Sequence, residues 1–282
     1  AFVGEYSRGK TELINSLFFS NFGQRLLPSR AGRTTMCPTE IFFDSQQAPA
    51  TLRLLPIETR NLENSLTDLK KQSQHWLEIA LDQTDADSLI SAFAHVAQNK
   101  SVAIEEAIAL GFLPEALEAA EQTDHVLVPA WRHALINIDH PLLRQGLRII
   151  DTPGLNALGS EPELTLSLLP SAQAILFLLS ADTGVRASDM ATWQQSMRSQ
   201  HAAQHAIQFA VLNKIDMLWD NLNHDTFAEH SIQMIQAQTA QQLGLPVTHV
   251  LPVSAKSALE AKVTDNSDLL MRSRIDALEH FL

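Results

Sequence analysis

Cysteine is almost absent from this sequence. Among its 282 residues, Cys37 is the only one, so the chain cannot form an internal disulfide and has no Cys-x-x-Cys pair for a zinc site. The lack of disulfides is typical of a reducing compartment. We therefore expect a cytoplasmic protein.

Basic residues are also scarce. The chain has 20 Lys and Arg against 32 Asp and Glu, for a formal net charge of −12, and no basic cluster stands out. Because duplex nucleic acid is bound largely through its phosphates, we expect no nucleic-acid partner. The same acidity indicates that any membrane-binding surface lies outside this segment.

Long hydrophobic runs are missing as well. The longest, residues 174–181, has the length of a strand, whereas a helix needs about 20 apolar residues to span a bilayer. The first residues have the pattern of a buried strand and not of a signal peptide. The opening strand is very short and a helical pattern over 269–282 stops abruptly, so we expect residues 1–282 to be one domain of a longer protein.

Short apolar runs alternate with helical patterns, which predicts an α/β domain whose mostly parallel central sheet has helices on both faces. The expected strands are residues 1–3, 39–43, 51–55, 134–138, 147–150, 174–179, 207–212 and 249–253, and the main helices are 10–17, 188–200 and 225–243. Between 58 and 131 no segment reads as a strand. We expect a helical insertion there, either a packing extension or lid, or an element that contacts another subunit or domain.

Residues 4–11, GEYSRGKT, fit the phosphate-binding pattern G-x-x-x-x-G-K-[ST] between a predicted strand and a predicted helix. Gly4 and Gly9 let the backbone bend so that its N–H groups face the phosphates, and the helix adds its N-terminal dipole. Lys10 is expected to reach the β- and γ-phosphates, and the Thr11 hydroxyl to bind Mg²⁺. The predicted phosphate loop consists of Gly4, Glu5, Tyr6, Ser7, Arg8, Gly9, Lys10 and Thr11.

Two further segments are expected to meet the metal and the γ-phosphate. Asp151 follows the strand 147–150 and can hold Mg²⁺ through water, while the Gly154 N–H of the same DTPG segment can contact the γ-phosphate. In the loop before the strand 39–43, a threonine can ligate Mg²⁺ and hold the attacking water through its carbonyl. Thr34 and Thr35 both fit that role.

The sequences NKID and SAK each follow a predicted strand and indicate a base-binding site. The carboxylate of Asp216 can accept hydrogen bonds from the N1–H and N2–H₂ groups of guanine, a donor pair that adenine lacks. Asn213 would brace the loop and Lys214 would stack along the base. The segment Ser254, Ala255 and Lys256 would offer the Ala255 N–H to the guanine O6.

The segments GEYSRGKTELINSLF, LLPSRAGRTTMCPTEI, DTPGL and NKID, in this order, resemble those of bacterial dynamin-like proteins, and the resemblance spans residues 4–256. In that family the threonine that begins T-x-x-P is catalytic, which favours Thr35. The resemblance also implies that Ser7 helps to bind a monovalent cation, K⁺ or Na⁺. Arg8 lies one residue beyond the position of a catalytic arginine in guanylate-binding relatives, and we expect it to form a surface salt bridge instead.

The resemblance implies a Mg²⁺-dependent GTPase that releases GDP and phosphate. It also implies a nucleotide-dependent homodimer and, in the full protein, membrane remodelling at the inner face of a membrane through regions outside this segment. Leu155 stands where Ras-like enzymes have a glutamine that orients water, so an isolated monomer is expected to be slow. Two alternatives remain: an Era-like GTPase associated with ribosomes or RNA, and a GTP-dependent assembly module with negligible hydrolysis.

Overall fold

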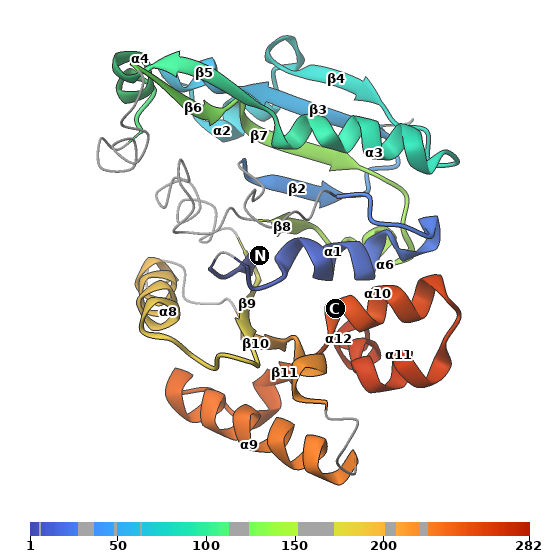
Figure 1. The fold of residues 1–282 in the computed structure, drawn as a ribbon. Helices are drawn as coiled ribbons and strands as arrows, with labels where there is room; N and C mark the ends of the chain where they lie inside the picture. Colours follow the sequence, from blue (N-terminus) through green and yellow to red (C-terminus); the bar gives the residue numbers. More distant parts are fainter. Residues whose placement is uncertain are drawn as a thin grey trace. The chain divides into compact units, whose positions relative to one another are not determined.

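The computed structural model describes residues 1–5, 7–27, 37–47, 50–62, 64–112, 124–151, 172–200, 207–219 and 225–282 (Figure 1). The chain divides into two compact units. The terminal unit comprises residues 1–29 and 163–282, and the central unit comprises residues 30–162.

The terminal unit is built on a parallel sheet. Its strands, in spatial order, are β1 (Phe2–Val3), β9 (Ala174–Ser180), β10 (Ile207–Asn213) and β11 (Val250–Pro252). Most side chains of β9 and β10 are buried, as expected of parallel strands that are covered on both faces. The predicted α/β class with a largely parallel sheet is confirmed.

Helices cover both faces of this sheet. On one face, Trp193 of α8 (Ala187–Gln200) packs edge-on against Phe177 of β9, with ring centroids 5.2 Å apart. On the other face, Phe209 of β10 contacts Phe281 of α12 (Ile275–Phe281) at 4.0 Å. Phe177 lies opposite the residue after Phe209 in the parallel register, and successive side chains of a strand point to opposite faces. The predicted arrangement of helices is therefore confirmed in this unit.

The other helices within the described part of the terminal unit are α1 (Lys10–Phe18), α9 (Asp225–Leu243), α10 (Ala255–Val263) and α11 (Ser267–Ser273), with 3-10 turns at Ser20–Phe22, Ile215–Leu218 and Val247–His249. The single helix predicted over 269–282 was wrong. Arg274 adopts a left-handed conformation with φ 57° and separates α11 from α12. The break redirects the chain so that Ile275 and Leu278 are fully buried.

The central unit has a five-stranded sheet and a small hairpin. In spatial order the sheet strands are β8 (Ile149–Asp151), β2 (Thr39–Phe42), β7 (Trp131–Asn137), β3 (Thr51–Pro56) and β4 (Leu77–Ala80). Of these, β2 and β7 are parallel and the other neighbours are antiparallel. The antiparallel hairpin consists of β5 (Asn99–Ala103) and β6 (His125–Pro129).

The prediction that no strand lies between residues 58 and 131 was wrong. Helices are present there, but β4, β5 and β6 lie in the same stretch. Among its described residues, the central unit has the α-helices α2 (Leu66–Lys70), α3 (Ala86–Ala94), α4 (Ile104–Ala109) and α6 (Pro141–Arg144), and 3-10 turns at Ile57–Asn61, Ser73–His75 and His95–Ala97. The hairpin and α4 share a small core, made of Ile57, Val102, Ala107, Leu110, Phe112, Val126 and Val128.

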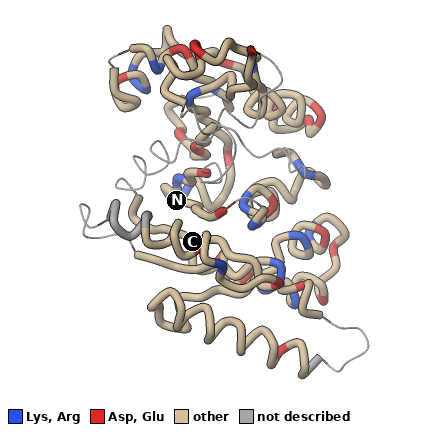
Figure 2. The backbone as a smooth tube through the Cα atoms, turned by 60° about the vertical axis from the view of Figure 1, so that its left-hand side comes forward, with Lys and Arg blue, Asp and Glu red and all other residues tan. Residues whose placement is uncertain are grey.

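Charge is dispersed over the described residues. Figure 2 shows lysines and arginines scattered over many elements, with aspartates and glutamates among them. Among the helices of the described ranges, none is both long enough and apolar enough to cross a membrane.

Candidate nucleotide-binding site

The predicted phosphate loop connects β1 to α1, and its two glycines have little space around them. A Cβ atom on Gly4 would lie 2.7 Å from the carbonyl oxygen of Leu178. Gly9, at φ 86°, is the N-cap of α1, and a Cβ there would lie 2.3 Å from Nδ2 of Asn213. Ser7 also has a left-handed φ of 63°. Glycine is therefore required at both positions by contact with neighbouring strands and loops.

Gly9→Ala is expected to lower the melting temperature. The close contact with Asn213 and the strained φ together cost about 1–3 kcal/mol, and each kcal/mol shifts the melting of a domain of this size by about 2–4 °C. Gly244→Ala is the control, because Gly244 has a φ of 70° but an added Cβ would meet no atom within 4 Å. Calorimetric melting temperatures that were equal for the two variants would contradict the predicted clash.

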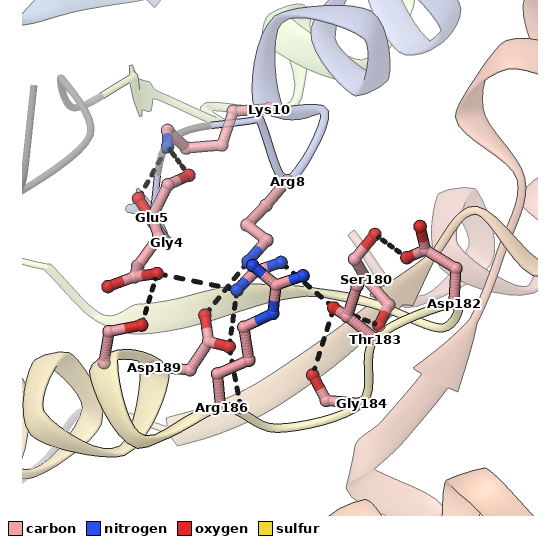
Figure 3. Close-up of polar contacts among 11 residues, drawn as sticks. Gly4, Glu5, Arg8, Lys10, Ser180, Asp182, Thr183, Gly184, Arg186 and Asp189 are labelled. Atoms are coloured by element: carbon pink, nitrogen blue, oxygen red, sulfur yellow. Dashed lines mark hydrogen bonds and ion pairs between the residues drawn. The ribbon is translucent and has the colours of Figure 1, made fainter.

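Lys10 lies against the carbonyls of the phosphate loop. Its Nζ donates to the carbonyl oxygen of Gly4 at 2.6 Å and to that of Glu5 at 3.0 Å, as Figure 3 shows. The side chain is 6% exposed. Thr11, the next residue of α1, is partly exposed. The N-terminus of α1 thus presents an ammonium group, a hydroxyl and the helix dipole beside a strained loop, which favours anion binding.

The side chain of Asn213 joins two loops of the site. Its Nδ2 donates to the carbonyl oxygen of Arg8 in the phosphate loop at 3.0 Å. Its Oδ1 accepts from the backbone N–H of Lys214 at 2.8 Å and from that of Ala255 at 3.0 Å. Lys214 itself has a left-handed φ of 65°. The Ala255 N–H, predicted to meet the guanine O6, is thus engaged by Asn213 in this structure.

Asp216 is oriented by Ser254. The Ser254 hydroxyl donates to Oδ1 of Asp216 at 2.6 Å and accepts from the backbone N–H of Ser257 at 3.2 Å, which makes Ser254 the N-cap of α10. Ser254 is fully buried, whereas Asp216 is partly exposed and Lys256 is exposed. A rigid helix end therefore holds the carboxylate that is predicted to read the base.

Arg8 was predicted to form a surface salt bridge, and this prediction was wrong about its location. The residue is 5% exposed. Its guanidinium forms a two-pronged ion pair with Asp189 of α8, with Nε–Oδ1 at 3.0 Å and Nη2–Oδ2 at 2.6 Å. No motif in the sequence marks Asp189, which lies far along the chain in the terminal unit.

Oxygen donors suited to Mg²⁺ are present in both units. Thr11 offers a hydroxyl, and Asp151, the last residue of β8, offers a carboxylate that is 2% exposed. Mg²⁺ is bound through such hard oxygen ligands, together with waters and substrate phosphates. The described ranges hold no group of three or more His, Cys, Asp or Glu that could bind a metal by itself. Tyr6, Thr34, Thr35, Gly154 and Leu155 lie outside the described residues.

Strand β2, which follows the loop predicted to contain the Mg²⁺-binding threonine, is anchored by Glu40, a residue that the sequence analysis did not identify. Glu40 is 2% exposed and accepts from Nε2 of His133 at 2.9 Å, from Nη1 of Arg148 at 3.0 Å, and from Lys70. Burial alone would raise the pKa of Glu40, but the hydrogen bond from His133 and the charge of Lys70 hold that pKa well below its usual value. The carboxylate is therefore ionised at neutral pH and fixes β2.

One solved structure shares this fold, and a second gives a weaker match. A structure of an oligomerised bacterial dynamin pair matches with a TM-score of 0.50 and 13% identity, over 99% of this chain and 36% of that chain. Era from Aquifex aeolicus, bound to GDP·AlF4⁻, matches with a TM-score of 0.39 and 16% identity, over 95% of this chain and 54% of that chain. The first likeness shows the fold alone.

Sequence comparison places the chain in a family. Over 129 residues it is 33% identical to an Arabidopsis thaliana protein, "Probable transmembrane GTPase FZO-like, chloroplastic"; the stretch is 45% of this chain and 13% of that protein. The matched stretch thus spans only a small part of that relative's length. The sequence model of the dynamin family matches residues 1–215. Because that match covers most of the chain, the chain belongs to the dynamin family of GTPases.

Proposed function

We propose that this GTPase domain binds GTP across the phosphate loop and the NKID and SAK loops, and hydrolyses it to GDP and phosphate with Mg²⁺. The observation that carries the proposal is the side chain of Asn213. It bonds to Arg8 in the phosphate loop and to Ala255 in the SAK loop. One buried amide thereby fixes the spacing between a phosphate site and a base site, as a nucleotide of constant length requires.

The residues have separate roles in binding. Lys10 and the N–H groups of the phosphate loop take the phosphates, and Asp216 reads the donor edge of guanine. Thr11, Thr35 and Asp151 would hold the Mg²⁺, which when bound neutralises charge on the β- and γ-phosphates. GDP should occupy the same site, because most of these contacts do not involve the γ-phosphate.

Catalysis requires groups in addition to the binding residues. We assign the positioning of the attacking water to Thr35 and a γ-phosphate contact to the Gly154 N–H. Leu155 offers no hydrogen bond to the water. Ser7, which is exposed in the phosphate loop, would bind a monovalent cation, K⁺ or Na⁺, to offset charge in the transition state. Pairing of two nucleotide-loaded domains would order the loops and exclude water.

In the full protein, we propose that GTP binding and hydrolysis by this domain serve membrane remodelling. The domain would act in the cytoplasm at the inner face of a membrane, reached through regions outside residues 1–282. The FZO-like relative is named as a transmembrane GTPase, and the bacterial dynamin pair is described as sensing and tethering membranes. These names support the proposal that the partners are a second copy of the chain and a membrane, and the net charge of −12 argues against a nucleic-acid partner.

The test is GTP turnover per molecule across a wide range of protein concentrations, in K⁺ and in choline buffers. Turnover should rise with concentration as domains pair, and should be higher in K⁺ because a cation at Ser7 offsets developing charge. A flat, cation-independent rate as high as that of a fast GTPase would show that a single chain positions the water. Tight GTP binding with negligible turnover at every concentration would identify a nucleotide-dependent assembly module instead.

A further inference from the structure

Arg8 lies between two residues of the phosphate loop that have left-handed backbone conformations. The residues on either side of it, Ser7 and Gly9, both have left-handed φ values, 63° and 86°. Successive backbone N–H groups in such a turn form a concave anion site. A non-glycine residue in this conformation persists only where the surrounding structure fixes it. Contacts around the phosphate loop must therefore hold Ser7 in this conformation.

The Arg8 side chain supplies one set of these contacts. Besides its two bonds to Asp189, its Nη1 donates to Oγ1 of Thr183 at 3.2 Å. Asp189 is fully buried, and its Oδ2 also accepts from the backbone N–H of Arg186 at 3.0 Å. Figure 3 shows the guanidinium surrounded by these groups from the β9–α8 connection and the start of α8. The side chain is thus fixed to an element that is remote in sequence.

A second carboxylate, that of Glu5, connects the first half of the phosphate loop to the start of α8 as well. Oε2 of Glu5 accepts from Nη2 of Arg8 at 3.5 Å and from the hydroxyl of Ser188 in α8 at 2.8 Å. The guanidinium therefore lies between two carboxylates, both anchored by α8. In Figure 3 the Lys10 ammonium bonds instead to the carbonyls of Gly4 and Glu5. The two cationic side chains of the loop make different contacts.

The Arg8 main chain is fixed as well, because its carbonyl oxygen accepts from Nδ2 of Asn213. Arg8 thereby connects three parts of the terminal unit: the phosphate loop, the start of α8 and the NKID loop. The same carbonyl brings Asn213 close to Gly9, where a Cβ would lie 2.3 Å from Nδ2. Side-chain and main-chain contacts of one residue thus determine the shape of the anion site.

We infer that Arg8 is a positioning residue whose side chain holds the phosphate loop in its anion-binding shape before the nucleotide arrives, through Asp189 and Glu5, and does not itself contact the phosphates. The inference rests on the proposed nucleotide site. Preorganisation raises affinity because less ordering accompanies binding. The apparent dissociation constant increases as the fraction of competent protein falls. Losing this constraint should weaken GDP and GTP equally, since both place phosphates in the same loop.

The test must separate positioning from folding. Arg8→Ala alone would leave Asp189 as a buried, uncompensated charge, which is strongly destabilising. The informative variant is Arg8→Met combined with Asp189→Asn, because a neutral replacement of both members of the closer ion pair is often tolerated, while Glu5 keeps its bond from the Ser188 hydroxyl. The new amide oxygen can still accept from the Arg186 N–H. Calorimetric melting and Kd values for GDP and for GTP are then measured on the same samples.

We expect this double variant to melt within a few degrees of the wild type, while both Kd values rise by about ten-fold and kcat at saturating GTP changes by less than about three-fold. The Kd values of Arg8→Lys should lie between those of the wild type and those of the double variant, because lysine keeps the charge but loses the two-pronged geometry. Arg25→Ala is the control. It removes an arginine that pairs with Glu12 at the surface of the same unit, and both Kd values should stay at the wild-type level.

Wild-type Kd values in a folded double variant would overturn the inference. A loss of kcat with unchanged Kd would also overturn it, because Arg8 would then be a catalytic residue. Failure of the wild-type domain to bind GTP or GDP at all would instead overturn the proposed function, and the inference with it. The wild-type titration therefore distinguishes the two failures.

Discussion

Asp216→Asn is expected to weaken GTP binding by on the order of a thousand-fold and to strengthen binding of xanthosine triphosphate. In the wild type, one carboxylate oxygen accepts from the Ser254 hydroxyl at 2.6 Å. In the variant, the amide oxygen can keep that bond, so the amide NH₂ takes the place of the other carboxylate oxygen. There it meets the N2–H₂ donors of guanine, and a donor left facing a donor loses its hydrogen bond in a desolvated site.

Xanthine carries a carbonyl at C2 in place of the amino group, and that carbonyl can accept from the new amide. Calorimetric titrations with GTP, xanthosine triphosphate and ATP measure the exchange of specificity. Asp276→Asn, at an exposed position of α12, is the control for the change in net charge. Ser254→Ala should weaken GTP without favouring xanthosine triphosphate, because it removes the support and keeps the carboxylate. Comparable wild-type affinities for GTP and ATP would refute the assignment of Asp216.

The strands that bear nucleotide-binding residues were predictable because their signals are local. Each is a short apolar run that ends in a glycine-rich or polar turn, and α1, α8 and α9 follow at the predicted residues. In the terminal unit the run of buried residues over Ala174–Ser180 is typical of a parallel strand covered on both faces. A pattern that depends only on neighbours in the chain is visible without the fold.

The hairpin of the central unit was missed for the opposite reason. β5, Asn99–Ala103, is mostly polar and buries only Val102. β6 does alternate, with Val126 and Val128 buried while Leu127 is 62% exposed. Its partner strand, β5, shows no alternation of apolar and polar residues, so the sequence did not indicate that the two strands pair. These strands are specified by contact with α4 and Ile57, which is tertiary information.

The ion-pair partner of Arg8 could not be predicted from the sequence either. Asp189 is 181 positions away in the sequence. It lies in the first turn of a helix, where an acidic residue is common and indicates no particular partner. A charged residue inside a phosphate-binding motif suggests exposure, because the ligand itself is charged. Burial of Arg8 follows from the close approach of the β9–α8 connection and the start of α8, where Thr183 and Asp189 respectively meet the guanidinium. Burial at this site therefore became visible only from the structure.

Lys10→Ala is expected to weaken both GTP and GDP by on the order of a hundred-fold or more, since each charge-assisted hydrogen bond lost to a phosphate is worth about 1.5–3 kcal/mol. The Lys10 ammonium already lies at the loop, bonded to the carbonyl oxygens of Gly4 and Glu5. Phosphate oxygens can replace those carbonyls with little rearrangement. Without the ammonium, the phosphates retain the backbone N–H donors, the helix dipole and the proposed Mg²⁺, but no charged side chain of the phosphate loop.

Because Lys10 is 6% exposed, truncation to alanine also removes buried methylene groups, and Lys10→Met separates that packing loss from the loss of charge. The methionine variant should melt close to the wild type without nucleotide, yet show the same weak binding as Lys10→Ala. Its melting temperature should also gain much less on addition of GDP, because stabilisation by a ligand falls as its Kd rises. Fluorescence titration and thermal melting with and without GDP measure both effects. Wild-type affinity in Lys10→Met would mean that the phosphates bind away from the N-terminus of α1, and residues 4–11 would then have to be reassigned to a structural turn.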